Sequence, residues 1–249
     1  MTDFYTSNDG TDKLYKHTGF TTTIASSIAS PSANPAGVSW DGTDLYSASY
    51  TANKVYKHSG FTTTISSSIA LTGAYGVCWF NSQLFSLNLT DNKFYQHTGF
   101  TTTIEDSFSI TSGGGRGCVM DESGNIIGGN AGTIYYRYTG FTSTILDSIT
   151  SPSNGNTGAS WDAGNDFYSS DANSADKYYH HSGFTTTITA SFAAESAIPR
   201  DVEADDRPQA VAASSSIKSI NGLAIASVKS RNGLAIASVK SINGLSNVS

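Results

Sequence analysis

The chain has 249 residues, 14% of them charged, with a formal net charge of −6, and its polar positions are mostly Ser, Thr, Gly and Asn, which favours strands and turns over long helices. No stretch approaches the ~18 apolar residues that a membrane span needs, and the N-terminus lacks a basic start followed by an apolar run. The sequence therefore predicts a soluble all-β protein with no membrane partner and no export signal.

One phrase recurs five times along the chain. Its first copy reads KLYKHTGFTTTI from Lys13, and successive copies are 41, 39, 41 and 43 residues apart. A period of this size is typical of one supersecondary unit repeated in space. The glycine of the phrase falls at Gly19, Gly60, Gly99, Gly140 and Gly183.

Each unit is predicted to contain four short strands. In the second unit an apolar segment at 37–40 is followed by an Asp-Gly turn and by an alternating strand at 44–50. A third strand at 53–56 ends at the turn HSG, and FTTTISSSI at 61–69 is expected to be an outer edge strand. Four antiparallel strands per unit, arranged radially, predict a five-bladed β-propeller over residues 1–206.

The first unit lacks its inner strand at the N-terminus. A counterpart follows the fifth copy of the phrase as DVEADD at 201–206, which aligns Val202 with Val38 and Asp205 with Asp41. This segment is expected to pair with residues 2–7 and so to close the ring.

Cysteine and histidine are not predicted to bind metal. Cys78 and Cys118 lie one register apart in equivalent strands, so their side chains should leave opposite faces, and we expect reduced structural residues. Histidine recurs at one strand end, but blade symmetry separates these side chains, whereas metal ligands must converge. No cofactor is predicted. The recurring histidines are His17, His58, His97 and His181.

A repeated tryptophan is the first candidate ligand-binding position. Trp40, Trp79 and Trp161 share one place in the inner strand, where an indole could stack on a sugar ring. Packing between blades is the alternative.

A repeated aspartate follows the tryptophan and is the second candidate. Asp41, Asp121 and Asp162 could line one mouth of the central channel, or they could simply form turns. Paired carboxylates can hydrolyse glycosides, but catalytic acids are expected to be singular and these are shared by the blades. The sequence therefore favours a non-enzymatic protein.

The second unit carries a resemblance to known propellers. GVSWDGTDLYSASYTANKVYKHSGF at 37–61 resembles the blades of NHL-type and YVTN-type propellers, with their Gly-Val strand, Asp-Gly turn, LY strand and NK-V-Y strand. The blade count is similar to that of tachylectin-type lectins, which also have aromatics in repeated positions. The fourth unit departs from the pattern, because Met120 replaces tryptophan and Gly128 and Gly129 replace bulky strand residues.

Residues 207–249 differ from the repeats. A small-residue linker at 207–216 leads into residues 217–249, where Asn-Gly pairs recur every 11 residues between apolar runs, a strong hairpin signal. The segment has five basic and no acidic residues, but without aromatic partners these do not predict nucleic-acid binding. It is too short to bury its apolar side chains alone, so it should dock in an oligomeric assembly. The docking residues are predicted to include Ile217, Ile220, Leu223, Ile225, Leu234 and Ile236.

The sequence SIKSINGLAIASVKSRNGLAIASVKSINGL at 216–245 resembles the short repeat tails of bacteriophage and other virion structural proteins. The resemblance implies a virion protein assembled in the host cytoplasm, with other structural proteins as partners of the tail and proteins or host glycans as partners of the propeller. Two alternatives stay open: a lectin-like protein of an extracellular surface, and a glycan-processing enzyme that uses the repeated aspartates.

Overall fold

The computed structural model describes residues 2–206, except 112, 131, 173 and 174, and six two-residue strands between 219 and 246. The chain divides into two compact units, Met1–Gln209 and Ala210–Ser249. Among the described residues, no helix is long and apolar enough to cross a membrane.

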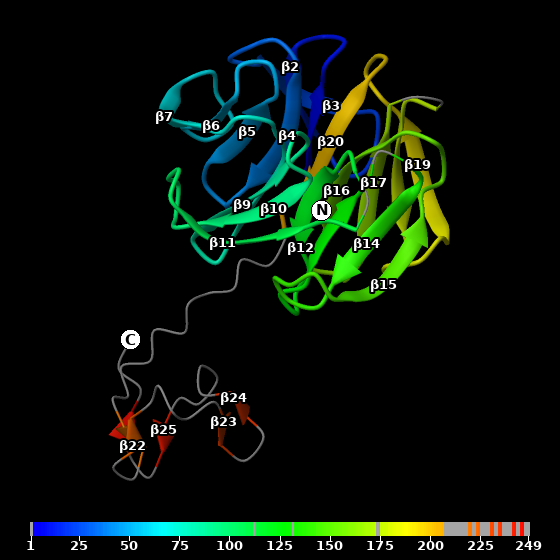
Figure 1. Ribbon diagram of the computed structural model, residues 1–249. Coiled ribbons are helices and arrows are strands. Elements are labelled where there is room, and N and C mark those ends of the chain that lie inside the picture. The colour runs from blue at the N-terminus through cyan, green and yellow to red at the C-terminus, as the bar shows by residue number, and fades with distance from the viewer. Residues whose placement is uncertain are drawn as a thin grey trace. The chain divides into compact units, whose positions relative to one another are not determined.

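The first unit is a five-bladed β-propeller, as the repeats predict (Figure 1). From the inside outwards, blade 1 is β20 (Pro199–Ala204), β1 (Phe4–Asn8), β2 (Lys13–His17) and β3 (Ile24–Ala29). Blade 2 is β4 (Pro35–Trp40), β5 (Leu45–Ser49), β6 (Lys54–His58) and β7 (Ile65–Ala70). Blade 3 is β8 (Ala74–Phe80), β9 (Gln83–Asn88), β10 (Lys93–His97) and β11 (Ile104–Ser109). Blade 4 is β12 (Arg116–Met120), β13 (Ile126–Gly129), β14 (Ile134–Tyr138) and β15 (Ile145–Thr150). Blade 5 is β16 (Asn156–Trp161), β17 (Phe167–Asp171), β18 (Lys177–His181) and β19 (Ile188–Ala193).

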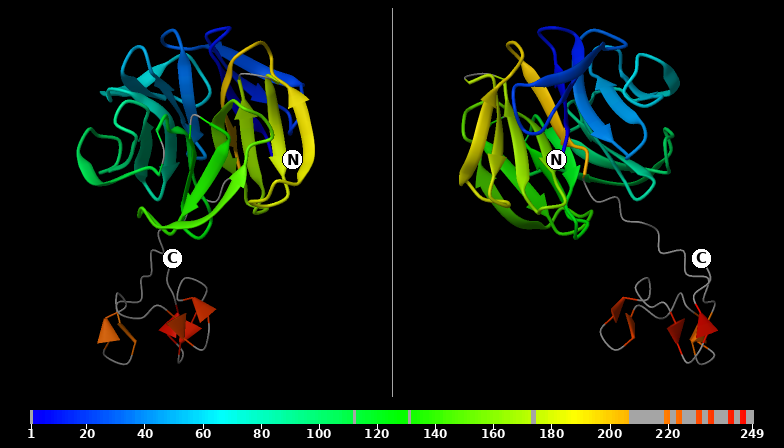
Figure 2. Two further views of the ribbon diagram at one scale, coloured as in Figure 1. Left: turned by 45° about the vertical axis from the view of Figure 1, so that its right-hand side comes forward. Right: turned by 180° about the vertical axis from the view of Figure 1, so that it is seen from behind.

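The ring is closed by the predicted C-terminal strand. β20 pairs antiparallel with β1, with Phe4 opposite Ala204 and Thr6 opposite Val202, and the five inner strands contact one another in a closed cycle. In both views of Figure 2 the orange strand β20 lies among the inner strands, beside the dark blue start of the chain. The paired strands are 199–204 and 4–8: the first lies two residues before the predicted 201–206, and the second begins two residues and ends one residue after the predicted 2–7.

The segment FTTT is a turn and does not belong to the outer strand. In blade 2, Gly60 has a positive φ of 65°, and the Thr62 hydroxyl donates to the Ser59 carbonyl at 2.9 Å. The Thr64 N–H in turn donates to the Thr62 hydroxyl at 3.2 Å. Because threonine can satisfy backbone groups locally in this way, the outer strand begins only at Ile65.

The core lies between blades, and the two cysteines illustrate why. Cys78 of blade 3 and Cys118 of blade 4 do leave opposite faces of equivalent strands. Opposite faces of adjacent blades are the faces that meet, so both side chains are buried in one cluster with Phe85, Leu87 and Phe94. The predicted opposite faces are confirmed, and these two faces pack against each other in adjacent blades.

Two carboxylates of β20 bind the closing strand to both neighbouring blades. Asp201 accepts the N–H of Val38 in blade 2 at 2.9 Å and that of Ala159 in blade 5 at 3.1 Å. Four blades have glycine where blade 1 has Asp201, and an added Cβ at Gly37 would lie 2.7 Å from a neighbouring backbone nitrogen. The Asp201 side chain lies over Gly158 of blade 5, where an added Cβ would collide with its Oδ1.

Glu203 makes the second such bridge. Its Oε1 accepts the Ser39 hydroxyl of blade 2 at 3.2 Å, and its Oε2 accepts the Ser160 hydroxyl of blade 5 at 3.2 Å. Asp201 and Glu203 are each only 1% exposed. Ring closure thus rests on side-chain bridges as well as on the β20–β1 ladder.

The described residues of the second unit form three antiparallel strand pairs. The predicted turns at 221–222, 232–233 and 243–244, the linker 207–216 and the docking residues Ile217, Ile225 and Ile236 lie outside the described residues, while Ile220, Leu223 and Leu234 lie in described strands. The pairs are β21 (Ser219–Ile220) with β22 (Leu223–Ala224), β23 (Ser230–Arg231) with β24 (Leu234–Ala235), and β25 (Ser241–Ile242) with β26 (Leu245–Ser246).

Candidate functional site

The repeated tryptophans lie against aromatic rings of neighbouring blades. Trp40 stacks on Tyr5 of blade 1 and Trp79 stacks on Tyr46 of blade 2, both with ring centroids 4.8 Å apart. Trp161 is 4% exposed and belongs to a buried cluster. This arrangement serves packing between blades, and it leaves at most one indole face of Trp40 and Trp79 for a ligand.

The repeated aspartates organise the turn that follows the inner strand. Asp41 Oδ1 accepts the N–H groups of Thr43 and Asp44 at 2.8 and 2.7 Å, and its Oδ2 accepts the Tyr46 hydroxyl at 2.9 Å. Asp121 and Asp162 also accept turn N–H groups through Oδ1. The three carboxylates lie in three different blades, and most of their acceptor capacity is used locally.

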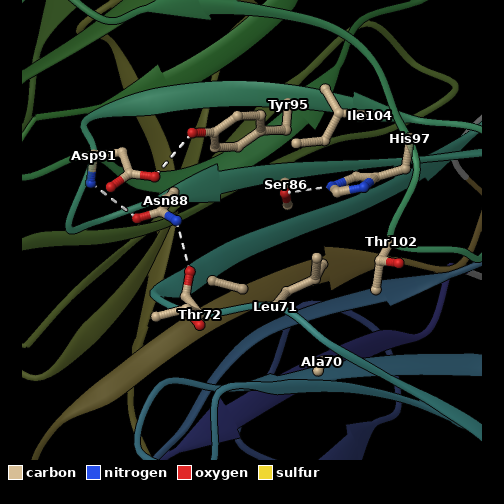
Figure 3. Close-up of a pocket in the computed structure, with 11 residues that line it drawn as sticks. Ala70, Leu71, Thr72, Ser86, Asn88, Asp91, Tyr95, His97, Thr102 and Ile104 are labelled. Atoms are coloured by element: carbon tan, nitrogen blue, oxygen red, sulfur yellow. Dashed lines mark hydrogen bonds between the residues drawn. The ribbon is translucent and has the colours of Figure 1, made fainter.

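A cavity of about 220 Å³ lies between blades 2 and 3 (Figure 3). One wall is formed by β9, β10 and the start of β11, all in blade 3. The other wall is formed by the end of β7 and the segment that follows it. Its lining residues are Ala70, Leu71, Thr72, Ala74, Ser86, Asn88, Asp91, Tyr95, His97, Thr102 and Ile104. We refer to it as the blade 2–3 cavity.

A serine–histidine pair lies in this cavity and recurs in other blades. Ser86 Oγ is 2.9 Å from His97 Nε2, and Ser47 with His58 and Ser169 with His181 repeat the contact at 2.9 and 2.8 Å. In the last two pairs Nδ1 lies 2.8 Å from a threonine carbonyl, so Nδ1 must carry the proton and Nε2 accepts from the serine. Burial lowers the pKa of His97 and His181 to about 4, which keeps both rings neutral near pH 7.

Blade 1 shows what can fill such a cavity. Glu195, which follows β19 as Thr72 follows β7, inserts its carboxylate between the blades and contacts His17 Nε2 at 2.6 Å. Burial would raise the pKa of Glu195, but hydrogen bonds from His17 and Thr6 lower it overall. The shorter Thr72 leaves the corresponding space between blades 2 and 3 open.

The geometry of the Glu195 contact argues against a catalytic triad. A triad needs the nucleophile and the orienting acid on opposite nitrogens of the imidazole. Here the Thr6 hydroxyl and the Glu195 carboxylate both approach Nε2 of His17, at 3.2 and 2.6 Å. The arrangement is a buried hydrogen-bond network and lacks the relay geometry of hydrolases.

Blade 4 lacks the pair through two compensating replacements. Gly128 replaces the serine, and Tyr138 replaces the histidine. An added Cβ at Gly128 would lie 2.5 Å from the Phe94 ring, and Tyr138 packs edge-on to that ring with centroids 5.8 Å apart. The smaller residue therefore makes room for the larger aromatic packing, and no equivalent polar pair forms there.

An exposed isoleucine repeats at the start of every outer strand. Ile104 is 52% exposed, lies opposite His97 in the β10–β11 ladder and lines the blade 2–3 cavity. A large apolar side chain that is 37–52% exposed at the same position in all five blades contributes little to the core. The equivalents are Ile24, Ile65, Ile145 and Ile188, which are 37% to 45% exposed.

No protein-family model and no curated protein matches this sequence. A chain of a nidogen/laminin complex superposes with a TM-score of 0.61 and 12% identity, over 82% of this chain and 98% of that chain. Glutaminyl cyclase of Myxococcus xanthus superposes with a TM-score of 0.56 and 14% identity, over 64% of this chain and 70% of its own. A chain of a mitotic checkpoint complex, at 13% identity and a TM-score of 0.49 over 78% of this chain, is matched over 62% of its length. The chain is therefore a five-bladed β-propeller protein, and at these identities the likeness concerns the fold alone.

The buried histidines predict acid-sensitive stability. Because the pKa of His97 is about 4 in the folded chain and about 6.5 when unfolded, only the unfolded state binds the proton between these values. This stability is fully present above pH 6.5 and is lost as the pH falls towards 4, up to about 3 kcal/mol for His97. We expect the free energy of unfolding of His97→Gln, measured in urea, to fall less than that of the wild type over this interval. Parallel curves for the two proteins would contradict this role of His97.

Proposed function

We propose that the propeller is a non-enzymatic, multivalent binding module whose ligand sites lie between adjacent blades. The observation that carries the proposal is the repetition of exposed side chains, above all the isoleucine at the start of each outer strand. The turn geometry accounts for the repeated glycine and the first threonine of the phrase, but it does not require an exposed isoleucine. A set of similar surfaces on one ring favours binding through avidity.

The chemistry of the blade 2–3 cavity favours a sugar residue as ligand. It is smaller than the roughly 300–1,000 Å³ of pockets for drug-sized molecules, so it suits one small polar unit. Tyr95 offers a half-buried aromatic ring, and Asn88, Asp91 and Thr102 offer hydrogen-bonding groups around it. An aromatic plane beside several polar groups matches the alternating apolar and hydroxyl-bearing faces of a carbohydrate.

A glycan array followed by calorimetry on any hit tests the proposal. We expect Ile104→Ser to weaken array binding by less than tenfold, because the exposed isoleucines of the other blades still contact the glycan. Replacing all five repeated isoleucines by serine should weaken it by at least a hundredfold through loss of avidity. Glu122→Gln, in an exposed turn outside the cavity, is the matched control. Equal binding by the wild type and the five-isoleucine variant would reject the inter-blade sites.

The same hits decide between binding and catalysis. Incubation of the wild type with a bound glycan should leave the glycan intact. Hydrolysis that disappears in Asp121→Asn or Asp162→Asn, in variants that keep the wild-type circular dichroism spectrum, would support the glycan-processing alternative.

We further propose that the second unit anchors the chain in an assembly, as a virion structural protein. Support comes from the likeness of its 11-residue repeat to virion tail repeats and from its three short strand pairs, which are too small to form a stable core alone. Light scattering after size exclusion should show an oligomer for the full chain and a monomer for a chain ending at Gln209. If both chains are monomeric and enter particles equally well, the propeller and not the second unit is the anchor.

A further inference from the structure

One end of the central channel carries basic and aromatic side chains that lie outside the blade 2–3 cavity. The residue before the inner-strand glycine is Tyr75 in blade 3 and Arg116 in blade 4, and its equivalent in blade 1 is Arg200. Equivalent positions of the five inner strands form one ring, so these three side chains point to the same end of the channel. We refer to them as the mouth cluster.

Both guanidinium groups of the mouth cluster approach one tyrosine. The Cζ atoms of Arg116 and Arg200 lie 5.5 and 5.7 Å from the centroid of the Tyr75 ring, which is 5% exposed. Arg200 Nη1 also donates to the Tyr75 hydroxyl at 2.5 Å. The cation–π interaction with the Tyr75 ring stabilises each guanidinium group, but it does not neutralise the positive charges.

The positive charge of the cluster is only partly balanced. Asp9 pairs with Arg200, accepting from its Nε at 3.1 Å and from its Nη2. Within residues 2–206, Arg116 forms no ion pair, and its buried Nε–H meets no acceptor. Asp201, the residue after Arg200, already accepts three backbone N–H groups. Within the mouth cluster, the Arg116 guanidinium is therefore the cation whose charge no carboxylate balances. This holds although all twenty acidic residues of the chain lie in residues 1–206.

A cavity adjoins the cluster. It has a volume of about 260 Å³, and Arg200 and Tyr75 contribute to its wall together with Tyr50 and Thr51. Tyr50 is 39% exposed, and its ring is 6.3 Å from that of Tyr75 at an interplanar angle of 62°. The cavity thus offers a guanidinium, two aromatic rings and a hydroxyl. Asn34 and Ala36 complete its lining.

We propose that the mouth cluster binds the carboxylate of an acidic sugar residue, with the sugar ring against Tyr50 in the adjoining cavity. Arg200 uses three of its five N–H donors on Asp9 and Tyr75, which leaves two for a ligand. Arg116 supplies the uncompensated charge that an anion would balance. The site shares no lining residue with the blade 2–3 cavity, so it does not depend on ligands between the blades.

Calorimetric titration of the full chain with glucuronate, glucose and acetate tests the proposal. Glucuronate should bind at least tenfold more tightly than glucose, which lacks the charge, and than acetate, which lacks the ring. Arg116→Gln should weaken glucuronate binding at least tenfold, and Arg116→Lys, which keeps the charge but loses the planar fork, should fall between the two. Tyr50→Ala should weaken glucuronate binding and leave acetate unchanged. The thermal unfolding midpoint of Arg116→Gln should fall only slightly, since the contact with the Tyr75 ring is lost but no ion pair is.

Four results would overturn the inference. Equal affinity for glucose and glucuronate would show that charge is not recognised, and equal affinity for acetate and glucuronate would reduce the site to a simple anion site. Unchanged glucuronate binding by folded Arg116→Gln would remove the mouth cluster from the site. The five-isoleucine variant should bind glucuronate like the wild type. Loss of binding in that variant, with Arg116→Gln unaffected, would assign the ligand to the spaces between blades instead.

Discussion

A chain that ends at Ile198 is expected to aggregate. Such a truncation removes β20, so the backbone groups of β1 lose their inner partner and an unpaired strand edge is exposed inside the ring. It also uncovers Phe4 and Tyr5, which are 2% exposed in the closed propeller, and removes both carboxylate bridges to blades 2 and 5. Loss of a ladder, of buried aromatic surface and of inter-blade hydrogen bonds together exceeds the 5–15 kcal/mol by which a domain is typically stable.

Size exclusion and circular dichroism measure this effect. The matched control is a chain that ends at Gln209, which keeps β20 and lacks the second unit. We expect the control to run as a compact monomer with a cooperative unfolding transition, and the shorter chain to elute in the void volume or precipitate. A soluble, monomeric shorter chain with the same transition would show that four complete blades and an open fifth are stable without closure.

The architecture could be predicted because the repeats fix the register of one unit against the next. The missing inner strand of blade 1 reappears at the other end of the chain, which only a closed ring requires. The strand boundaries were less predictable: Thr62 and Thr64 are β-branched residues that suit a strand, yet local hydroxyl hydrogen bonds hold them in a turn.

The candidate site was harder to predict because it depends on contacts between units. Repetition of Ser86, His97 and Ile104 was visible in the sequence, but whether a space remains beside them depends on Thr72 of the previous blade. In blade 1 the corresponding Glu195 fills that space. For Trp40 and Trp79 the sequence allowed both sugar stacking and packing between blades, and the structure shows tyrosines of neighbouring blades stacked on them.

Asp201 departs from the repeat, since the other four inner strands have glycine at the equivalent position. We expect Asp201→Ala to destabilise the propeller strongly, because the N–H groups of Val38 and Ala159 lose their acceptor in a buried channel. At about 1–3 kcal/mol for each buried unsatisfied group, the loss should amount to roughly 2–6 kcal/mol. Asp201→Asn keeps one oxygen and most of the volume, so urea unfolding should show a smaller loss. The alanine and asparagine variants being equally stable would rule out the hydrogen bonds as the cause.

Comparing the stability of the wild type and of Asp201→Asn at different pH values distinguishes the effect of the ionisable carboxyl group from the effect of side-chain shape. Burial, together with the neighbouring Glu203, raises the pKa of Asp201 well above its usual value. The folded state therefore binds a proton that the unfolded state has already released above about pH 4. Stability from this group is fully present in acid and declines as the pH rises, which is the opposite sign to that of His97 and His181. Asparagine does not titrate, so the advantage of the wild type over Asp201→Asn should be largest near pH 4 and shrink towards pH 8. An advantage that grows with pH would mean that the backbone N–H groups of blades 2 and 5 hold Asp201 as an anion, and that the ring is closed by a buried charge.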